Sequence, residues 1–349
     1  MSDLCLLALH RLFLNRAGEL RALLARTGDP VAATEEIPPG ELDAVMSQAE
    51  ADAGWLDQPG HHLIDISAAD YPSALKEIYD PPCLLFASGD ASLLKKPQNR
   101  VAIVGSRKAS AYGLKQAGRI AGDICGHDIA VVSGLALGID AAAHEGTLAA
   151  GGVTIAVLGT GPDQVYPRRH WRLAERIRQS GLLISEFPPG IPAFPANFPS
   201  RNRIVTGLSR ATVVVEAATG SGSLISARLA LSEGRDVMAV PGLVTNRQAR
   251  GCHRLIRDGA TLVESGADVL KELGIDGELT LQLGGGLEAG QLALLDVLSQ
   301  GPQSIDMLMA AVPLTVEELT VNLVSLEVQG LIVSEAGAFQ LARVTGIES

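Results

Sequence analysis

The stretch VAIVGSRKASAYGLKQAGRIAGDICGHDIAVVS, residues 101–133, decides the fold. It begins with a short apolar run over residues 101–104, continues with a longer periodic segment over residues 111–126, and ends with a second apolar run over residues 129–132. Short apolar runs bounded by glycine are typical of buried strands, and the longer 3.6-residue period is typical of an amphipathic helix. This order predicts a parallel βαβ unit.

The same alternation continues on the C-terminal side of this unit. Helices are predicted over residues 139–150, 170–179, 202–208, 224–233 and 251–258, and strands over residues 154–158, 182–184, 212–215, 237–240 and 261–263. Repeated strand–helix units of this kind predict an α/β domain with an extended, Rossmann-like parallel sheet core and helices on both faces.

The flanking segments have different patterns. Residues 1–60 predict a small helical domain because leucines recur at helical spacing, and residues 61–94 predict an added strand and connection on the sheet. A run of three glycines marks a linker over residues 276–289. Residues 290–349 predict three short helices and a β-hairpin, which is typical of a winged helix. The core domain is therefore expected to span residues 61–275.

The formal net charge of −11 comes from the two ends of the chain. Residues 1–80 carry 5 basic and 14 acidic side chains, and residues 261–349 carry 2 basic and 13 acidic side chains. By contrast, residues 95–119 hold 7 basic and no acidic side chains, and residues 161–210 hold 8 basic and 3 acidic ones. One such block alone is usually a solvated helix face. Two blocks in the same domain predict a basic face that suits nucleic acid.

The composition also bounds the cellular setting. The four cysteines are scattered, with no C-x-x-C pair and no histidine-rich cluster, so neither a disulfide framework nor a metal site is predicted. The apolar stretch over residues 4–14 is interrupted by His10 and Arg11, which disfavours a signal peptide. No uninterrupted apolar run reaches membrane-spanning length. We expect a soluble, cytoplasmic protein without a membrane partner.

Residues 185–210, SEFPPGIPAFPANFPSRNRIVTGLSR, combine aromatic rings with cations. Three of the chain's six phenylalanines lie here: Phe187, Phe194 and Phe198. Interleaved prolines predict an irregular loop around these rings, which makes it unlikely that all three belong to the core. Arg201, Asn202 and Arg203 follow at the expected first turn of a helix, where free N–H groups favour phosphate. Stacking rings beside phosphate-binding groups suit single-stranded nucleic acid.

Several polar loops follow the predicted strands and would meet at the carboxyl edge of the sheet, where open α/β folds bind ligands. Backbone N–H groups in such loops bind anions, although for any one loop a tight turn explains the glycines equally well. A further loop lies at residues 159–161. The loop positions that we predict to contact DNA are Gly105, Ser106, Arg107, Ser133, Gly134, Gly138, Ser221, Gly222 and Ser223.

Two other interpretations compete with DNA binding: a bound nucleotide cofactor and a hydrolytic activity. No G-x-G-x-x-G follows residues 101–104, and Ser133 stands where a ribose-binding carboxylate belongs, so no cofactor is predicted. Residues 220–223, GSGS, weakly resemble the P-G-G-x-G-T-x-x-E loop of phosphoribohydrolases, but Ser226 replaces that family's glutamate. A nucleotide-binding phosphoribohydrolase remains the alternative. Asp140 and Glu216 are expected to orient Arg107 or to cap backbone N–H groups, and no catalytic residue is predicted.

The motifs GSR, SGLALGID, AAAH, YPRRH, SEFPPG, FPSRNRIVTGLS, VVVEA, SGSLISA and AVPG occur in the order that characterises the DNA-processing protein A family (DprA or Smf), over roughly residues 65–270. The resemblance implies a cytoplasmic bacterial protein that binds single-stranded DNA, dimerises and helps to load the RecA recombinase in natural transformation, without enzymatic turnover. It also implies a DNA pocket lined by Arg107, Phe198, Arg201 and Arg203.

The two ends of the chain depart from the resemblance. The family's N-terminal part often resembles a sterile-alpha-motif or helix-hairpin-helix module, but the G-I-G hairpin signature is absent here, with residues 12–18 in its place. Winged helices usually read DNA with a basic helix, whereas the helix predicted over residues 316–329 contains Glu317, Glu318 and Glu327 and no Lys or Arg. We expect a protein-interaction or autoregulatory role for residues 290–349.

Overall fold

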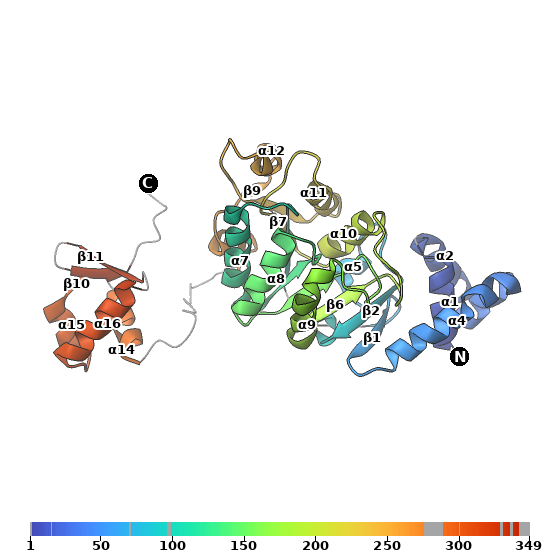
Figure 1. Cartoon of the computed structure of the whole chain (residues 1–349), viewed down its shortest axis with the longest axis horizontal. Coiled ribbons are helices and arrows are strands. Elements are labelled where there is room, and N and C mark those ends of the chain that lie inside the picture. Colours follow the sequence, from blue (N-terminus) through green and yellow to red (C-terminus); the bar gives the residue numbers. More distant parts are fainter. Residues whose placement is uncertain are drawn as a thin grey trace. The chain divides into compact units, whose positions relative to one another are not determined.

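The structure is a computed structural model that describes residues 2–14, 16–69, 71–95, 99–275, 289–299, 301–328, 331–335 and 338–341 (Figure 1). The chain forms two compact units, Met1–Thr280 and Leu281–Ser349. The linker predicted over residues 276–289 lies outside the described residues, except for Ala289, which begins a helix.

A nine-stranded sheet forms the centre of the larger unit, with the order β1-β2-β6-β5-β4-β3-β7-β8-β9. Its parallel part consists of β3 (Asn99–Val104), β4 (Ile129–Ser133), β5 (Thr154–Val157), β6 (Leu182–Ser185), β7 (Ala211–Val214), β8 (Asp236–Ala239) and β9 (Thr261–Leu262). The chain builds outward from β3 to β4, β5 and β6, and then returns to the other side of β3 with β7. The predicted Rossmann-like core is confirmed.

Two further strands extend this sheet beyond β6. β1 (His61–Asp65) pairs antiparallel with β2 (Leu84–Gly89), and β2 pairs antiparallel with β6, so the sheet is mixed. The sequence predicted a single added strand here. That prediction was incomplete because β1 is a half-exposed edge strand with two polar histidines at its start, which hide its alternating pattern.

Helices cover both faces of the sheet. One face carries α7 (Ala111–Cys125), α8 (Ile139–Ala149), α9 (Trp171–Ser180) and α13 (Gly266–Glu272). The other carries α5 (Ser73–Lys76), α10 (Asn197–Gly207), α11 (Gly222–Ser232) and α12 (Arg250–Arg257). The shorter elements are α6 (Ser92–Lys95), η1 (Arg168–His170) and η2 (Arg247–Ala249). Side chains of β3 alternate between the two apolar cores, as the period of a strand requires.

Helix α10 differs from its prediction, because it begins at Asn197 rather than at residue 202. Pro199 lies in the first turn, where the missing N–H has no helical partner to lose. Phe198 therefore stands on a helix, and Arg201 and Arg203 lie in the second turn rather than the first. Phe187 is only 2% exposed and belongs to the core.

The N-terminal residues form four helices, α1 (Ser2–Leu12), α2 (Ala17–Thr27), α3 (Pro30–Glu35) and α4 (Pro39–Leu56). They pack against β2 through Phe86, whose ring centroid lies 6.2 Å from that of Trp55 and 5.9 Å from that of His10. Because these aromatic contacts continue the apolar core of the sheet edge, the four helices share a compact unit with the sheet.

The smaller unit contains α14 (Ala289–Ser299), α15 (Ile305–Ala311) and α16 (Val316–Val328), with a sheet in the order β10-β12-β11. The strands are β10 (Gln303–Ser304), β11 (Ile332–Glu335) and β12 (Ala338–Leu341). Three helices and a hairpin were predicted, and β10 is an additional short strand. In the part of the chain that the structure describes, no single helix is long and apolar enough to cross a membrane. One bent pair of helices, α15 with Val316–Glu327, has sufficient length and apolar character only when the two are taken together.

Candidate nucleic-acid interface

The loops that follow the parallel strands meet at the carboxyl edge of the sheet, which we call the rim. Here the Arg107 guanidinium carbon lies 5.3 Å from the centroid of the Phe198 ring. The centroid of the Tyr166 ring also lies 5.3 Å from that of Phe198. A small cavity of about 50 Å³ opens between them. We define the rim site as the residues that line this cavity: Arg107, Gly134, Ala136, Leu137, Tyr166, Pro167 and Phe198.

The backbone of the Arg107 turn is held against the loop after β4. Gly138 has φ +80°, and a Cβ atom on it would collide with the Ser106 carbonyl oxygen and approach the Arg107 backbone to 3.1 Å. The Ile139 N–H donates a 3.2 Å hydrogen bond to the Ser106 carbonyl. This packing requires glycine at 138 and fixes the turn, while the Arg107 side chain itself remains exposed.

Arg201 is buried beneath the rim site. It is 3% exposed, its Nη1 donates to the Val157 carbonyl, and its guanidinium lies directly against Gly134, so that no side chain fits there. Asp140, also buried, accepts hydrogen bonds from the Gly134 N–H at 3.2 Å and the Ala136 N–H at 3.4 Å. Desolvation lowers the pKa of Arg201 to about 10, so it stays cationic at neutral pH. Arg201 therefore supports the 134–136 turn from below.

Arg203 forms a bidentate ion pair with Glu186, with Nη2–Oε1 and Nη1–Oε2 distances of 2.6 and 2.9 Å. Its Nε also donates to the carbonyl oxygen and the carboxylate of Asp80, at 2.8 and 3.3 Å. The expectation that Arg201 and Arg203 present their charge at the first turn of the helix is therefore wrong. Both guanidiniums are turned into the structure: carboxylates and carbonyls hold Arg203, whereas Arg201 bonds the Val157 carbonyl and its buried Nε has no hydrogen-bond partner among the described residues.

The N-terminal helices hold the segment that leads from β6 to Phe198. His10 Nε2 donates a 2.8 Å hydrogen bond to the Glu186 carbonyl, and Arg11 Nη2 donates one of the same length to the Pro189 carbonyl. The carboxylate of the fully buried Asp52 orients Arg11, with 2.6 Å between Asp52 Oδ2 and Arg11 Nε. The helical module thus anchors the beginning of the loop that ends in α10.

The remaining predicted site residues lie in different surroundings. Ser133 is fully buried and donates to the Ile103 carbonyl, while Ser106 Oγ accepts from the Lys108 N–H within its own turn. Gly105 packs against Ile139, 2.5 Å from a Cβ built on the glycine. Ser221, Gly222 and Ser223 begin α11 but do not line the rim site; the two hydroxyls lie 2.7 Å apart. Asn202 is half-buried, and its carbonyl accepts from Thr206.

The N-terminus of α7 follows the first strand of the core, where a dinucleotide fold would hold pyrophosphate. Here the Glu216 carboxylate occupies it and accepts hydrogen bonds from the Ser110 N–H and from the Asn246 side chain, at 2.8 and 3.1 Å. A phosphate at this helix end would meet a buried negative charge. The capping roles expected of Asp140 and Glu216 are confirmed.

Comparison with known proteins agrees with this geometry. A family model for DNA recombination-mediator protein A matches residues 62–274, and one for the DprA winged helix domain matches residues 282–338. The chain belongs to the DprA family. The family model covers the nine-stranded sheet and the rim site, and the second model covers the smaller unit, which is a winged helix.

Individual relatives of the DprA family match different shares of the chain. Protein Smf of Escherichia coli is 44% identical over 225 residues, which are 64% of this chain and 60% of that protein. The X-ray structure of DprA from Streptococcus pneumoniae superimposes with a TM-score of 0.62 at 41% identity, covering 70% of this chain and 85% of that one. A structure of DNA processing protein A from Helicobacter pylori, described for its single-stranded DNA binding mode, has a TM-score of 0.56 at 28% identity and covers 62% of this chain and 96% of that one.

Asn197 is a residue of the site that the sequence did not reveal. It is 6% exposed, and its Nδ2 donates a 3.1 Å hydrogen bond to the Gly159 carbonyl. The Gly159 turn in turn packs under Phe198, with 3.0 Å between the Phe198 Cδ1 atom and a Cβ built on the glycine. Because Asn197 falls in a proline-rich segment that predicts a loop, only its position before the FPSRNR motif could have indicated a helix start.

Two residues that a hydrolytic site would have to use are buried. Ser226, at the position of the phosphoribohydrolase glutamate, is 2% exposed inside α11. His144 is fully buried and its Nδ1 lies 2.7 Å from the Thr154 hydroxyl, which places it in the core. Among the described residues, no group of three or more His, Cys, Asp or Glu is arranged to hold a metal ion.

Proposed function

We propose that the protein binds single-stranded DNA at the rim site. In this proposal Arg107 holds phosphates, the Gly134 and Ala136 N–H groups stay bonded to Asp140 and shape the turn beside it, and bases stack on Phe198 and Tyr166. The observation that carries it is the position of the Arg107 guanidinium, 5.3 Å from the Phe198 ring and exposed. Aromatic platforms beside unpaired cations are what sequence-tolerant binding of a single strand requires.

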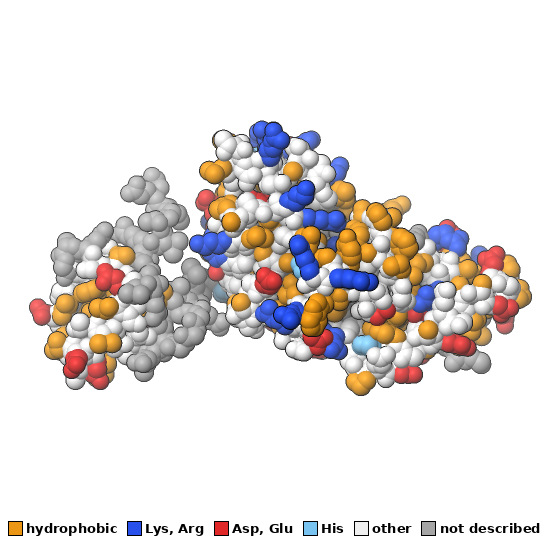
Figure 2. Space-filling view, viewed as in Figure 1, with side chains coloured by type: hydrophobic (Ala, Val, Ile, Leu, Met, Phe, Trp, Pro, Cys, Tyr) orange, Lys and Arg blue, Asp and Glu red, His pale blue; other side chains and the backbone are white. Residues whose placement is uncertain are grey.

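The charge around the rim site supports the proposal. Figure 2 shows Lys and Arg side chains gathered over the sheet unit, with acidic side chains concentrated on the N-terminal helices and on the winged helix. The turn η1 and the start of α9 add exposed cations beside Tyr166, together with Trp171, which is 57% exposed. The added cations are Arg168, Arg169 and Arg172.

Arg201, Asn202 and Arg203 have a supporting role in this proposal. Arg201 and Arg203 hold the floor and the flank of the site through Val157, Glu186 and Asp80. The positive charge of Arg201 still acts on a phosphate bound above it, because a buried charge is poorly screened. The Ser221 to Ser223 turn begins a separate helix, and we assign it no DNA contact.

The cellular role follows from the family rather than from the site. We infer a cytoplasmic protein that protects incoming single-stranded DNA, forms a homodimer and helps to load the RecA recombinase in natural transformation, without catalytic turnover. Membership of the DprA family and the likeness to a protein whose title names single-stranded DNA binding support these inferences.

A salt titration with labelled oligonucleotides tests the proposal. We expect tighter binding of a single strand than of a duplex of the same length, and a log Kd that rises linearly with log salt. A nucleotide hydrolase would instead bind no oligonucleotide and would release a free base from nucleoside monophosphates. Equal affinity for both oligonucleotide forms, or no affinity for either, would overturn the proposal.

A further inference from the structure

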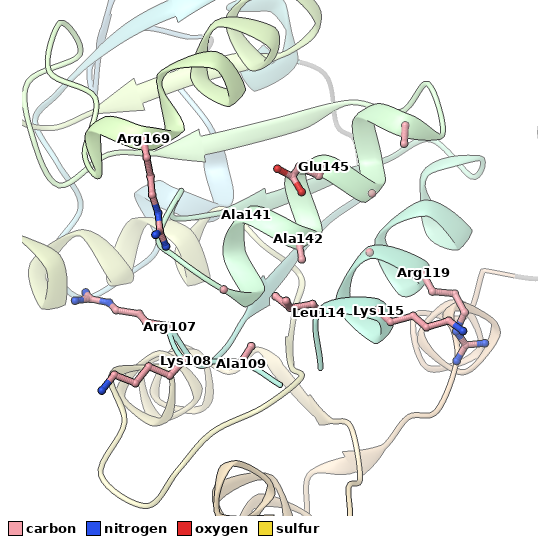
Figure 3. Close-up of a pocket in the computed structure, with 14 residues that line it drawn as sticks. Arg107, Lys108, Ala109, Leu114, Lys115, Arg119, Ala141, Ala142, Glu145 and Arg169 are labelled. Atoms are coloured by element: carbon pink, nitrogen blue, oxygen red, sulfur yellow. The ribbon is translucent and has the colours of Figure 1, made fainter. Parts of the chain in front are cut away.

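A second basic surface adjoins the rim site and extends between α7 and α8. It encloses about 780 Å³ and is lined at one end by Arg107, Lys108 and Arg169 and at the other by Lys115 and Arg119. Figure 3 shows these two groups of cations projecting from opposite ends of the same depression. We call this surface the α7–α8 groove.

The floor of the groove is shallow and apolar because the two helices approach closely. A Cβ atom on Gly146 would collide with the backbone of Gly118, so position 146 has no room for a side chain between the helices. Leu114, Ala142 and Ala149 line the floor, and Leu114 is 40% exposed. An apolar floor between cationic ends can accept the flat faces of bases while phosphates reach the sides.

Positive charge is in excess in the lining of the groove. Its lining contains five basic side chains and one acidic side chain, Glu145. None of the five forms an ion pair with a described carboxylate. Arg119 donates to the neutral oxygens of the Gln116 side chain and the Glu264 backbone, and its charge also acts on the Asp123 carboxylate, which does not line the groove.

The spacing of the cations on α7 suits a phosphate backbone. Lys115 and Arg119 are four residues apart on one helix, which places them on the same face about 5–6 Å apart at Cβ. Two neighbouring phosphates of an extended strand can pair with cations at this spacing. The groove also begins at Arg107, which the rim site shares, so a strand can pass from one to the other without a break.

We infer that the α7–α8 groove is a second subsite for single-stranded DNA, which carries the strand beyond the rim site with phosphates on Lys115 and Arg119. This inference rests on the proposed function at the rim site. An acidic protein segment, such as an end of this chain, fits the groove less well. It would have to supply a regular series of negative charges along the groove. A polyanionic strand supplies that series at every nucleotide.

The test compares oligothymidines of two lengths, about 6 and about 20 nucleotides, which span the range of site sizes for single-strand binding folds. For the Lys115→Ala/Arg119→Ala variant we expect unchanged binding of the short strand and at least about fivefold weaker binding of the long one. The slope of log Kd against log salt for the long strand should fall by about 1.4, because two phosphate contacts at about 0.7 each are lost. A Lys115→Gln/Arg119→Gln variant should behave alike.

The matched control removes the same charge at the opposite edge of the sheet. Arg210 precedes β7 and Arg178 lies in the last turn of α9, so Arg178→Ala/Arg210→Ala should leave both lengths unaffected. If the unmodified protein binds neither length, the proposed function fails. If it binds both and the groove variant keeps the affinity and salt slope of the long strand, or weakens the short strand equally, only the second subsite is overturned.

Discussion

The Ser110 hydroxyl donates a 2.6 Å hydrogen bond to the carboxylate of Glu216, at the first turn of α7. The two residues are 106 positions apart in the sequence and join the ends of β3 and β7, the strands between which the chain reverses its order. In open α/β folds this reversal point is the usual ligand crevice. Here it is closed by an internal carboxylate, and we propose that DNA binds instead at the rim site, on the β4 and β5 side.

We predict that Glu216→Ala lowers the free energy of unfolding by about 1.5–3 kcal/mol, because the Ser110 N–H loses a charged acceptor. The same change should also weaken binding of single-stranded DNA, since Glu216 fixes the turn that carries Arg107. Urea unfolding measures the first effect and fluorescence anisotropy the second. Glu145→Ala, which removes an exposed carboxylate, serves as the control for the unfolding measurement alone and should change stability by less than about 0.5 kcal/mol.

Substitutions of Arg107 and Arg201 should have different effects on stability and on DNA binding. Arg107→Ala should leave the free energy of unfolding within about 0.5 kcal/mol and lower the affinity for every sequence, with a salt slope smaller by about 0.7. Arg201→Ala should destabilise the fold by about 1–3 kcal/mol, because the buried Val157 carbonyl loses its donor and the buried Asp140 loses a nearby positive charge. A stable Arg201→Ala protein with lost affinity would contradict the supporting role given to this residue.

Phe198→Ala should cost about 1–3 kcal/mol of binding free energy if one base stacks on this ring. Phe198→Trp keeps an aromatic face and should retain most of the affinity. Phe194 is 53% exposed and lies on the preceding loop, so Phe194→Ala is the matched control, with a smaller expected loss. Fluorescence anisotropy with oligothymidine measures the affinity of all three variants. Equal losses of affinity for the two alanine variants would contradict the assignment of the stacking position to Phe198.

Two buried histidines should make the stability of the fold depend on pH. Burial lowers the pKa of His144 to about 3, from 6.5 in an unfolded chain, and the pKa of His10 is lowered as well. Below pH 6.5 the unfolded state binds protons that the folded state does not, so stability falls as pH falls. For His144 alone the slope is about 1.4 kcal/mol per pH unit down to the folded pKa.

Urea unfolding between pH 7.5 and pH 4.5 tests this dependence. His144→Gln should flatten the slope by about 1.4 kcal/mol per pH unit, although the variant is less stable at pH 7. The exposed His62→Gln variant should leave the slope unchanged. An unchanged slope for His144→Gln would mean that this side chain is not held neutral by burial.

The elements of the sheet could be predicted from the sequence because apolar periodicity reports local structure. The burial of Arg201 and Arg203 could not, since their partners are distant in the chain: Asp80 is 123 residues from Arg203. The start of α10 was missed for a local reason, because proline in a first turn gives the same sequence signal as proline in a loop. Motifs placed Arg107 and Phe198 in one site, but only the fold shows which cations face outward.

The winged helix should contribute little to holding DNA. Its helix α16 carries Glu317, Glu318 and Glu327, and a phosphate near these carboxylates would be repelled. A chain ending at Thr280, the boundary of the larger compact unit, should therefore bind oligothymidine within about threefold of the full chain, by the same anisotropy assay. A Glu317→Gln/Glu318→Gln variant of the full chain separates the effect of the negative charge on α16 from the effect of the bulk of the winged helix. If the acidic helix competes with DNA for the basic face, this variant should bind DNA more tightly at low salt. A large loss of affinity on truncation would place part of the binding surface on the winged helix.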